Sequence, residues 1–352
     1  EGKEIIKRQP MVDIVVGPQT YHRLPELLNS LSKTGRRIVD TAFPIENKFD
    51  ELQKIRNNKN PVAFLSIQEG CDKFCSFCVV PYTRGSEYSR PVKDIILEAK
   101  NLITQGAKEI CLLGQNVNAY HGEYNNKTLS LDELIYEIAN LEDVKRIRYM
   151  TSHPADMTEG LIKAHGNIEV LMPYLHLPVQ SGDDKVLKSM NRKYTSSEYL
   201  RIIEKLRNAR PDMVFSSDII IGFPGETDQA FKNTLDLVGK VNYSQAYSFK
   251  YSRRPGTPGS IMKGQIAESI KSERLMILQE ILYAQQLDFN KAFIGKSMEV
   301  LIERRKKNNQ LVGKSPYMQA VHLLEDNYDI GDILNIKVFD ADKNSLKGEV
   351  VQ

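Results

Sequence analysis

Apolar and polar positions follow a regular rhythm between residue 61 and about residue 260. Short apolar or β-branched runs predict strands, and amphipathic segments between them predict helices. The predicted strands are VAFLSI (62–67), EICLLG (109–114), RIRYMT (146–151), LMPYLHL (171–177), VFSSDIIIG (214–222) and SQAYSFKY (244–251). The predicted helices cover residues 93–106, 131–141, 158–166, 196–209 and 226–241. Two helix starts fit the capping-box pattern, Ser130 with Glu133 and Thr195 with Glu198.

Strands that alternate with helices predict an α/β fold with a parallel sheet that is buried on both faces. Right-handed crossovers allow such a sheet to open out or to curl into a partial barrel. Polar clusters follow the predicted strands at their carboxyl ends, where the active sites of these folds lie. They are GCDKFC, GQNVN, SHP, PVQSG, GFPGE and SRRPGTP.

The segments on either side of this rhythm have a different character. Residues 1–40 read as the remnant of an N-terminal α/β domain, with a strand at 11–17 and a helix at 21–31, and residues 41–60 read as a linker. A long helix is predicted over 266–291. Beyond it, short β-rich runs separated by polar turns predict a small antiparallel barrel. The predicted domains are therefore 1–40, 61–290 and 291–352, with the linker between the first two.

Composition narrows the class of protein. Of the 352 residues, 41% are hydrophobic and 26% are charged, which is typical of a globular chain. No apolar run approaches the roughly 20 residues that span a bilayer, so we expect a cytoplasmic protein with no membrane partner. The net charge is only +3, so any nucleic-acid footprint must be local.

Three of the four cysteines, Cys71, Cys75 and Cys78, lie within eight residues. In a cytosolic chain this spacing points to metal binding rather than to a disulfide scaffold. One loop with these spacings can wrap a compact iron–sulfur cluster, and three thiolates would leave one iron open. The alternative is structural zinc, completed by a distant His or by Cys111. Otherwise Cys111 is expected to be an ordinary core thiol.

The order C-x₃-C-x₂-C after a first strand, with an aromatic at Phe77, resembles the radical-SAM superfamily. That resemblance implies a partial (β/α)₆ barrel and a [4Fe–4S] cluster whose open iron chelates S-adenosylmethionine (SAM). It also implies that one electron splits SAM into a 5′-deoxyadenosyl radical.

Sequence segments around the cysteines and further along resemble the MiaB-type tRNA methylthiotransferases, and the resemblance extends over essentially the whole chain. These segments are SIQEGCDKFCSFCVVPYTRGSEYSR (66–90), LLGQNVNAY (112–120), TSHP (151–154), LHLPVQSGDDKVLKSMNR (175–192), SSDIIIGFPGET (216–227) and YSRRPGTP (251–258). GQNVN separates this branch from the branch that modifies a ribosomal protein, which should carry Gln-Asp there. Residues 296–352 resemble the TRAM domain, an RNA-binding module.

The resemblance implies that a methylthio group is inserted at carbon 2 of N6-isopentenyladenosine, next to the tRNA anticodon. It also implies two partners, tRNA and an electron donor of the flavodoxin or ferredoxin type. The alternatives are a methylthiotransferase acting on threonylcarbamoyladenosine or on a ribosomal protein, a non-catalytic zinc and RNA-binding module, and a decayed gene product.

The family uses three further cysteines, in an N-terminal domain, for a second [4Fe–4S] cluster that bears the sulfur. No cysteine precedes Cys71 here, and the opening residues resemble the family just after the last of those three. We therefore expect a chain that has lost an N-terminal piece, which binds SAM but does not complete methylthiolation.

The polar clusters after the strands provide candidate contacts to SAM. They are Gly114, Gln115, Asn116, Gln180, Ser181, Gly222, Gly225 and Glu226. Glycine permits close backbone approach to a ligand, although each cluster also fits an ordinary turn. His153 and His176 flank the same loops, and a structural role is expected for both.

A basic run in the terminal barrel, Arg304-Arg305-Lys306-Lys307 together with Lys314, is the candidate RNA contact. Such a hairpin would bind phosphates in a salt-dependent way. Residues 296–352 contain nine Lys/Arg and nine Asp/Glu, so the module is neutral overall and a solvated turn is the alternative.

Overall fold

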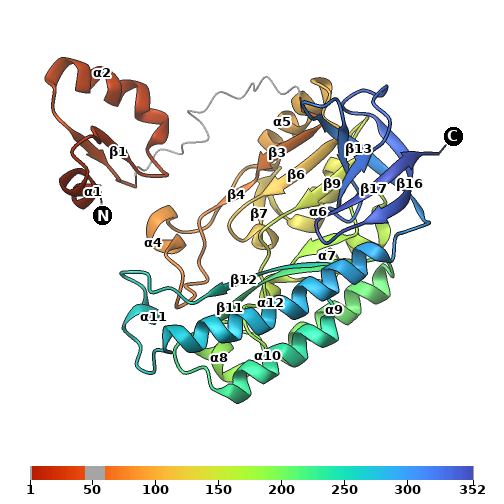
Figure 1. The fold of residues 1–352 in the computed structure, drawn as a ribbon. Helices are drawn as coiled ribbons and strands as arrows, with labels where there is room; N and C mark the ends of the chain where they lie inside the picture. Colours follow the sequence, from red (N-terminus) through yellow and green to blue (C-terminus); the bar gives the residue numbers. More distant parts are fainter. Residues whose placement is uncertain (1, 44–59, 352) are drawn as a thin grey trace.

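The computed structural model describes residues 2–43 and 60–351. Its centre is a curved parallel sheet in two halves, each of three strands (Figure 1). One half pairs β3 (Val62–Ser66), β6 (Glu109–Leu113) and β9 (Arg146–Tyr149), and the other pairs β10 (Tyr174–His176), β11 (Val214–Ile221) and β12 (Gln245–Lys250). A parallel bridge between Ile147 and Leu171 joins the halves. The predicted α/β class is confirmed.

Helices cover the outer face of this sheet because each has one apolar side. They are α5 (Val92–Thr104), α6 (Leu131–Ala139), α7 (Glu159–Asn167), α8 (Asp184–Ser189), α9 (Ser196–Ala209) and α10 (Asp228–Val241). Leu65, Ile110 and Ile147 point outward from the strands and are fully buried in the core with helix residues such as Leu134. Both predicted capping boxes are present, at the starts of α6 and α9.

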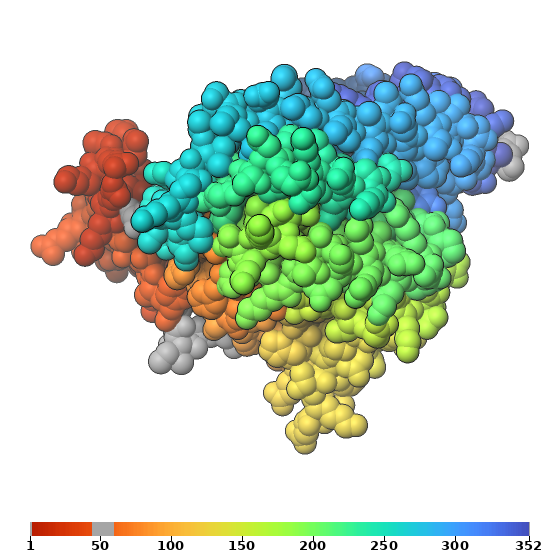
Figure 2. Space-filling view, turned by 90° about the horizontal axis from the view of Figure 1, so that it is seen from below, coloured from red at the N-terminus to blue at the C-terminus, as the bar shows by residue number. Residues whose placement is uncertain are grey.

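Two local predictions need correction. The strand predicted over 171–177 is reduced to Tyr174–His176, because Pro173 has no backbone N–H to donate to a ladder. An unpredicted hairpin, β7 (His121–Tyr124) and β8 (Lys127–Ser130), precedes α6. Its turn uses Asn125 and Asn126, both with positive φ, as a tight hairpin turn requires. The hairpin, in yellow, projects from the surface in Figure 2.

The inner face of the sheet is polar, because side chains alternate between faces along a strand. On this face Glu109 of β6 lies beside Arg146 of β9, and Cys111 of β6 lies beside Arg148 of β9. His176 lies beside Ser216 in the other half. Cys111 is buried, yet it faces these charges rather than the apolar core that was predicted for it.

The C-terminal residues form a closed five-stranded barrel in the order β13-β14-β15-β17-β16. The strands are β13 (Ser297–Arg305), β14 (Leu311–Lys314), β15 (Ala320–Leu323), β16 (Ile333–Ala341) and β17 (Ser345–Val350). The barrel was predicted to be antiparallel, and one pairing differs, since β15 and β17 run parallel. The long helix α12 (Glu268–Lys291) leads into it along the sheet (Figure 1).

Two buried arginines fasten this barrel to the strand β9. Arg146 donates to the carbonyls of Lys314 (2.8 Å) and Glu299 (3.0 Å). Arg148 donates to the carbonyls of Pro316 (2.7 Å) and Ser315 (3.0 Å) and to Glu109 Oε1 (3.0 Å). The C-terminal barrel therefore closes one end of the sheet.

The N-terminal residues form a small separate unit, in red in Figure 1. It contains α1 (Gly2–Arg8), β1 (Ile14–Val16), the short 3₁₀ helix η1 (Tyr21–Arg23), α2 (Leu24–Thr34) and β2 (Ile38–Asp40), with β1 and β2 parallel. Most of the predicted linker, residues 44–59, lies outside the described residues. Across 2–43 and 60–351, no helix is both long enough and apolar enough to cross a membrane.

The remaining elements are short and lie in the loops between strands and helices. They are β4 (Gln68–Glu69), α4 (Val80–Arg84), β5 (Tyr88–Ser89), η2 (Val117–Ala119), η3 (Pro154–Asp156) and α11 (Pro258–Ile261). Most of them follow the carboxyl ends of the parallel strands, where the polar clusters lie.

Candidate functional site

The cysteine loop leaves β3 through β4, which pairs with β5 where the loop returns. Its entry point is Gly70, with φ +76°. A Cβ on Gly70 would lie 1.9 Å from the carbonyl oxygen of Ser86, so a side chain here would force the two ends of the loop apart. Phe74 also has positive φ, which is strained for a residue with a side chain. The loop is therefore held in a specific conformation.

Each of the three thiols in this loop has an N–H donor. Arg192 Nη1 donates to Cys75 Sγ (3.5 Å), and the backbone N–H of Val80 donates to Cys78 Sγ (3.4 Å). Burial raises the pKa of Cys71 to about 11, while the backbone N–H of Lys73 acts in the opposite direction. Burial likewise raises the pKa of Cys78. Such donors to sulfur are a feature of iron–sulfur sites.

The donor set consists of three soft thiols, which suit an iron–sulfur cluster. All four cysteines are free thiols, and Cys71, Cys75 and Cys78 are close enough to influence one another's charge. In a cubane cluster each thiolate would bind a different iron.

The segment 189–192, which starts at the last residue of α8, holds the cysteine loop in place, and we call it the clamp loop. Ser76 donates through its backbone N–H to Met190 O (3.0 Å) and through its hydroxyl to Ser189 O (2.8 Å). Asn191 Nδ2 donates to the carbonyls of Lys73 and Phe74. More than 110 residues of chain separate the partners, so this contact is tertiary and not visible in the motif.

Gln68 connects the start of the cysteine loop to the end of β6. Its Oε1 accepts from the backbone N–H groups of Gln115 (2.8 Å) and Asn116 (3.2 Å), and Gln115 Oε1 accepts from Gly70 N (2.7 Å). A Cβ on Gly114 would lie 2.5 Å from Gln68 Oε1. Gly114 and Gln115 are therefore needed to hold the two loops together, and the side chain of Gln115 is already engaged.

Unpartnered buried polar atoms follow five strands of the parallel sheet, β6, β9, β10, β11 and β12. Among the described residues, none of these atoms has a hydrogen-bond partner: Asn116 Oδ1, Ser152 Oγ, His153 Nε2, Gln180 Oε1, Glu226 Oε2 and Tyr251 OH. Buried polar atoms normally have partners. These atoms gather at the carboxyl end of the sheet. A polar cofactor with many donors and acceptors, bound there, would give them hydrogen-bond partners.

Two of these positions, Asn116 and Gln180, are otherwise tightly fixed. Asn116 Nδ2 donates to Glu87 Oε1 (3.0 Å) and to Asp156 Oδ2 (2.8 Å), and Asp156 pairs with Lys73 (2.7 Å). Gln180 has φ +70° and bridges to Ile219. Strain of this kind collects at functional sites.

The glycines after β11 form a loop closed by Glu226. Gly222 N donates to Glu226 Oε1 (3.0 Å), which also pairs with Arg274 of α12 (2.7 Å). Gly222 and Gly225 both have positive φ, so this turn needs glycine. Burial raises the pKa of Glu226, and its hydrogen bonds to Gly222 and Arg274 oppose that shift. One carboxylate oxygen thus holds the loop and the other is unpartnered.

Ser181 is placed differently from its neighbour Gln180. Its hydroxyl accepts from Asp183 N (3.2 Å) and contacts Thr234 Oγ1 (3.4 Å). These contacts fix the start of α8, and the predicted contact of Ser181 to SAM stays a prediction.

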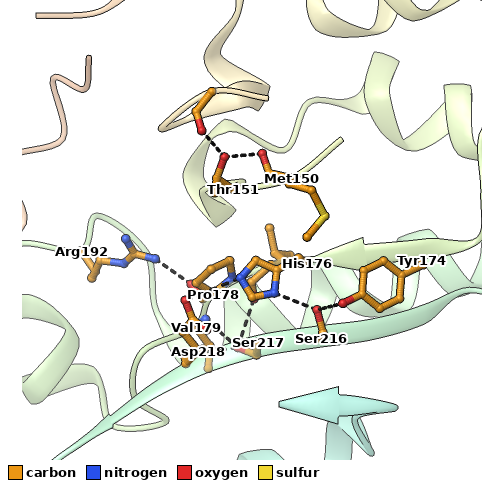
Figure 3. A network of polar contacts seen from close by, with 12 residues as sticks. Met150, Thr151, Tyr174, His176, Pro178, Val179, Arg192, Ser216, Ser217 and Asp218 are labelled. Atoms are coloured by element: carbon orange, nitrogen blue, oxygen red, sulfur yellow. Dashed lines mark hydrogen bonds and ion pairs between the residues drawn. The ribbon is translucent and has the colours of Figure 1, made fainter. Parts of the chain in front are cut away.

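The two histidines singled out in the sequence are both buried. Burial lowers the pKa of His153 to about 2, assisted by Arg192 and Lys73, so the ring is neutral. His176 Nδ1 contacts Ser216 Oγ (2.7 Å), to which Tyr174 OH donates (2.7 Å), and His176 Nε2 faces Asp218 at 3.6 Å. Figure 3 shows this network on the inner face, with Arg192 directed at the Pro178 carbonyl.

The basic run of the C-terminal barrel is only partly a surface patch. Arg304, Lys306 and Lys307 are exposed at the tip of the β13–β14 hairpin. Arg305 is exposed as well, but it donates to the carbonyls of Asp326 and Tyr328. Lys314 lies on β14, where its ammonium donates to Met318 O (3.0 Å) and where Arg304 is close enough to act on its charge. The RNA-binding role predicted for the basic run together with Lys314 stays a prediction.

Comparison with known proteins agrees with this geometry. Residues 65–238 match the radical SAM superfamily and residues 291–351 match the TRAM domain. The chain is 54% identical to the tRNA-2-methylthio-N(6)-dimethylallyladenosine synthase of Wolbachia sp. subsp. Brugia malayi, across 100% of this chain and 81% of that relative. The chain belongs to this synthase family. It is a radical-SAM methylthiotransferase, and the family implies a [4Fe–4S] cluster and SAM.

Other members of the synthase family align equally fully. The protein of the same name from Rickettsia felis is 53% identical over 100% of this chain and 80% of its own length. That from Sphingopyxis alaskensis is 52% identical over 99% and 79%. The chain thus spans about four fifths of these relatives.

Among solved structures, the radical SAM methyltransferase TsrM from Kitasatospora setae, with tryptophan and a SAM analogue, superposes with a TM-score of 0.52. It is 16% identical and covers 70% of this chain and 53% of its own. OxsB with aqua-cobalamin and SAM gives 0.51 at 14% identity, covering 82% and 41%. These similarities establish the fold alone.

The sequence motifs did not identify Gln68, the clamp loop, or the pair Arg146 and Arg148 as residues that hold the site in place. Each of them contacts a strand or loop that is distant in the sequence. The run LHLPVQSGDDKVLKSMNR contains Arg192, but nothing in its spacing marks that arginine as a partner of Cys75.

Proposed function

We propose that this protein acts as a tRNA-2-methylthio-N6-dimethylallyladenosine synthase. In this reaction a methylthio group is inserted at carbon 2 of N6-isopentenyladenosine next to the tRNA anticodon. The residues present would supply the radical step, and the sulfur would come from a second cluster whose ligands are not among them. The observation that carries the proposal is the 52–54% identity to synthases of that name across nearly the entire chain. The carbon 2 hydrogen is not acidic enough for a base to remove it, so the reaction requires a radical.

Cys71, Cys75 and Cys78 are the proposed ligands to three irons of a [4Fe–4S] cluster, with the fourth iron open to SAM. When bound, the cluster supplies the electron that splits SAM into a 5′-deoxyadenosyl radical. The N–H donor at each thiol supports this assignment, because donors to sulfur stabilise thiolate ligands. The electron comes from a donor of the flavodoxin or ferredoxin type.

The chain's own residues would bind and orient SAM at the carboxyl ends of the strands. We assign this role to Asn116, Gln180 and Glu226, each of which holds an unpartnered buried oxygen. Gly114, Gln115, Gly222 and Gly225 form the loops that carry them. Such preorganisation limits what must move when the cofactor binds. A second cluster would need ligands other than these three cysteines.

The C-terminal barrel would bind tRNA through the hairpin tip. Arg304, Arg305, Lys306 and Lys307 line a shallow pocket of about 560 Å³ with Asn308, and exposed Lys and Arg side chains suit phosphates. Because Arg146 and Arg148 fix the barrel to the sheet, tRNA held at the tip has a defined position relative to the cysteine loop.

Nucleoside analysis of tRNA from a strain lacking the gene tests this function. The expected result is loss of the 2-methylthio form and accumulation of N6-isopentenyladenosine. Loss of methylthio groups from threonylcarbamoyladenosine or from a ribosomal protein, with this nucleoside intact, would contradict the proposal. Restoration by the wild-type gene, but not by a Cys75→Ala gene, ties the result to the cysteine loop.

A further inference from the structure

Arg192 is a buried cation whose Nη1 group is directed at one thiol. Its Nη1 lies 3.5 Å from Cys75 Sγ, Nη2 donates to Pro178 O (2.6 Å), and Nε donates to Tyr194 OH (2.9 Å). The guanidinium carbon also lies 5.3 Å from the centre of the Tyr194 ring. These contacts fix its orientation, so the Nη1 group is held against the sulfur.

Two other buried arginines have carboxylate partners, whereas Arg146 donates to backbone carbonyls. Arg274 pairs with Glu226 and Asp228, and Arg148 pairs with Glu109. Within the described part of the chain, the groups that hydrogen-bond to the Arg192 guanidinium are Tyr194 OH, Pro178 O and Cys75 Sγ, and none of these is a carboxylate. Because an unpaired buried charge is costly, a ligand sulfur of a bound cluster would give Arg192 a negatively charged partner.

The three thiols are therefore not equivalent. Cys71 and Cys78 take neutral backbone donors, whereas Cys75 takes a full positive charge. The clamp loop fixes this arrangement, because Met190 and Asn191 hold the backbone on either side of Cys75 while Arg192 reaches its sulfur. The clamp loop thus positions the cysteine loop and places the positive charge of Arg192 beside the sulfur of Cys75.

We propose that Arg192 is a positioning residue that raises the reduction potential of the bound cluster through Cys75. This inference rests on the proposed function, since it needs Cys75 as an iron ligand. Reduction adds one electron from the external donor, with no bond broken and no proton moved. The added negative charge is stabilised by a fixed cation beside a ligand sulfur, and charge and hydrogen bonds at sulfur set such potentials.

A competing role for Arg192 is binding the carboxylate of SAM. The two roles differ in a measurable way, because a cation that acts through Cys75 shifts the potential before SAM is added. A residue that acts only on SAM would change the affinity for SAM and leave the SAM-free potential unchanged.

The test is a redox titration of the full chain, reconstituted anaerobically without SAM and followed by the electron paramagnetic resonance signal of the reduced cluster. Arg192→Met and Arg192→Lys are compared with wild type at equal iron and sulfide content. At the wild-type midpoint, Arg192→Met should lower the ratio of reduced to oxidised cluster at least tenfold, about 59 mV for one electron. Arg192→Lys, which keeps the charge, should change the ratio less.

The control is Arg207→Met, which alters a half-buried arginine that stacks on Phe215. This variant should leave the ratio of reduced to oxidised cluster within about threefold of the wild-type ratio. A change below threefold in a cluster-loaded Arg192→Met protein would overturn the inference while the proposed ligands stand. If Arg192→Met takes up no cluster, Arg192→Lys decides: a full cluster with a change below threefold supports the inference, and any other result refutes it. Wild type without iron and sulfide would overturn the proposed function as well.

Discussion

The replacement Arg148→Met tests how the C-terminal barrel is fastened to the sheet. The side chain of Arg148 is 1% exposed and that of its partner Glu109 is 4% exposed. The variant removes the ion pair and two hydrogen bonds to Ser315 and Pro316. It leaves the Glu109 carboxylate buried without its partner. Breaking a buried pair in this way costs about 3–5 kcal/mol.

A double variant separates the two contributions. In Glu109→Leu/Arg148→Met the buried carboxylate is gone, and apolar replacement of a whole ion pair is often close to neutral. The remaining loss, about 1–3 kcal/mol, should come from the unpartnered carbonyls. Arg146→Met is the matched comparison, because Arg146 donates only to carbonyls, and its cost should resemble that of the double variant.

The assays are urea unfolding followed by circular dichroism and hydrogen exchange of the β14 and β15 amides. Faster exchange of those amides in Arg148→Met, while α5 and α6 keep their protection, is the expected sign of a loosened barrel. A loss of less than about 1 kcal/mol in Arg148→Met, or a double variant no more stable than the single one, would refute this reasoning.

Three further predictions concern other parts of the chain. Gly70→Ala should abolish cluster uptake, because its Cβ would meet Ser86 O at 1.9 Å; iron content checks this, and normal uptake would show that the loop can rearrange. Burial lowers the pKa of His165 to about 3, so the unfolded state takes up a proton first as the pH falls below about 6.5. The free energy of unfolding should therefore be highest above pH 6.5 and should fall below it by up to about 1.4 kcal/mol per pH unit. His165→Gln should flatten that dependence in pH-dependent unfolding, and an unchanged slope would contradict a neutral ring. Replacing Arg304, Lys306 and Lys307 by Gln should reduce the salt dependence of tRNA binding by about 0.7–0.9 per lost phosphate contact, whereas an unchanged slope would place the RNA elsewhere.

The sequence pattern predicted the six parallel strands because short β-branched or apolar runs alternate with amphipathic helices, although the inner face of the sheet proved to be polar. It overextended β10, because the pattern LMPYLHL is apolar throughout and only the missing N–H of Pro173 ends the ladder. It missed the parallel pairing of β15 with β17, since closure of a barrel depends on which edges meet and not on the pattern within a strand.

The candidate site was predictable where its reactive residues lie close together in the sequence. The three cysteines lie within eight residues, and the glycines at 114, 222 and 225 mark tight loops. The partners of those residues were not predictable, because Gln68, Asn191 and Arg192 reach the cysteine loop and its neighbours only after the chain has folded.

The most direct test of the central claim measures iron, sulfide and SAM cleavage in the anaerobically reconstituted full chain. The account predicts a [4Fe–4S] cluster and formation of 5′-deoxyadenosine and methionine when SAM and a one-electron reductant are added. Cys71→Ala, Cys75→Ala and Cys78→Ala should each lose both, while Cys111→Ala retains them. A chain that takes up a single zinc ion, or alanine variants that still cleave SAM, would contradict the assignment of these three cysteines.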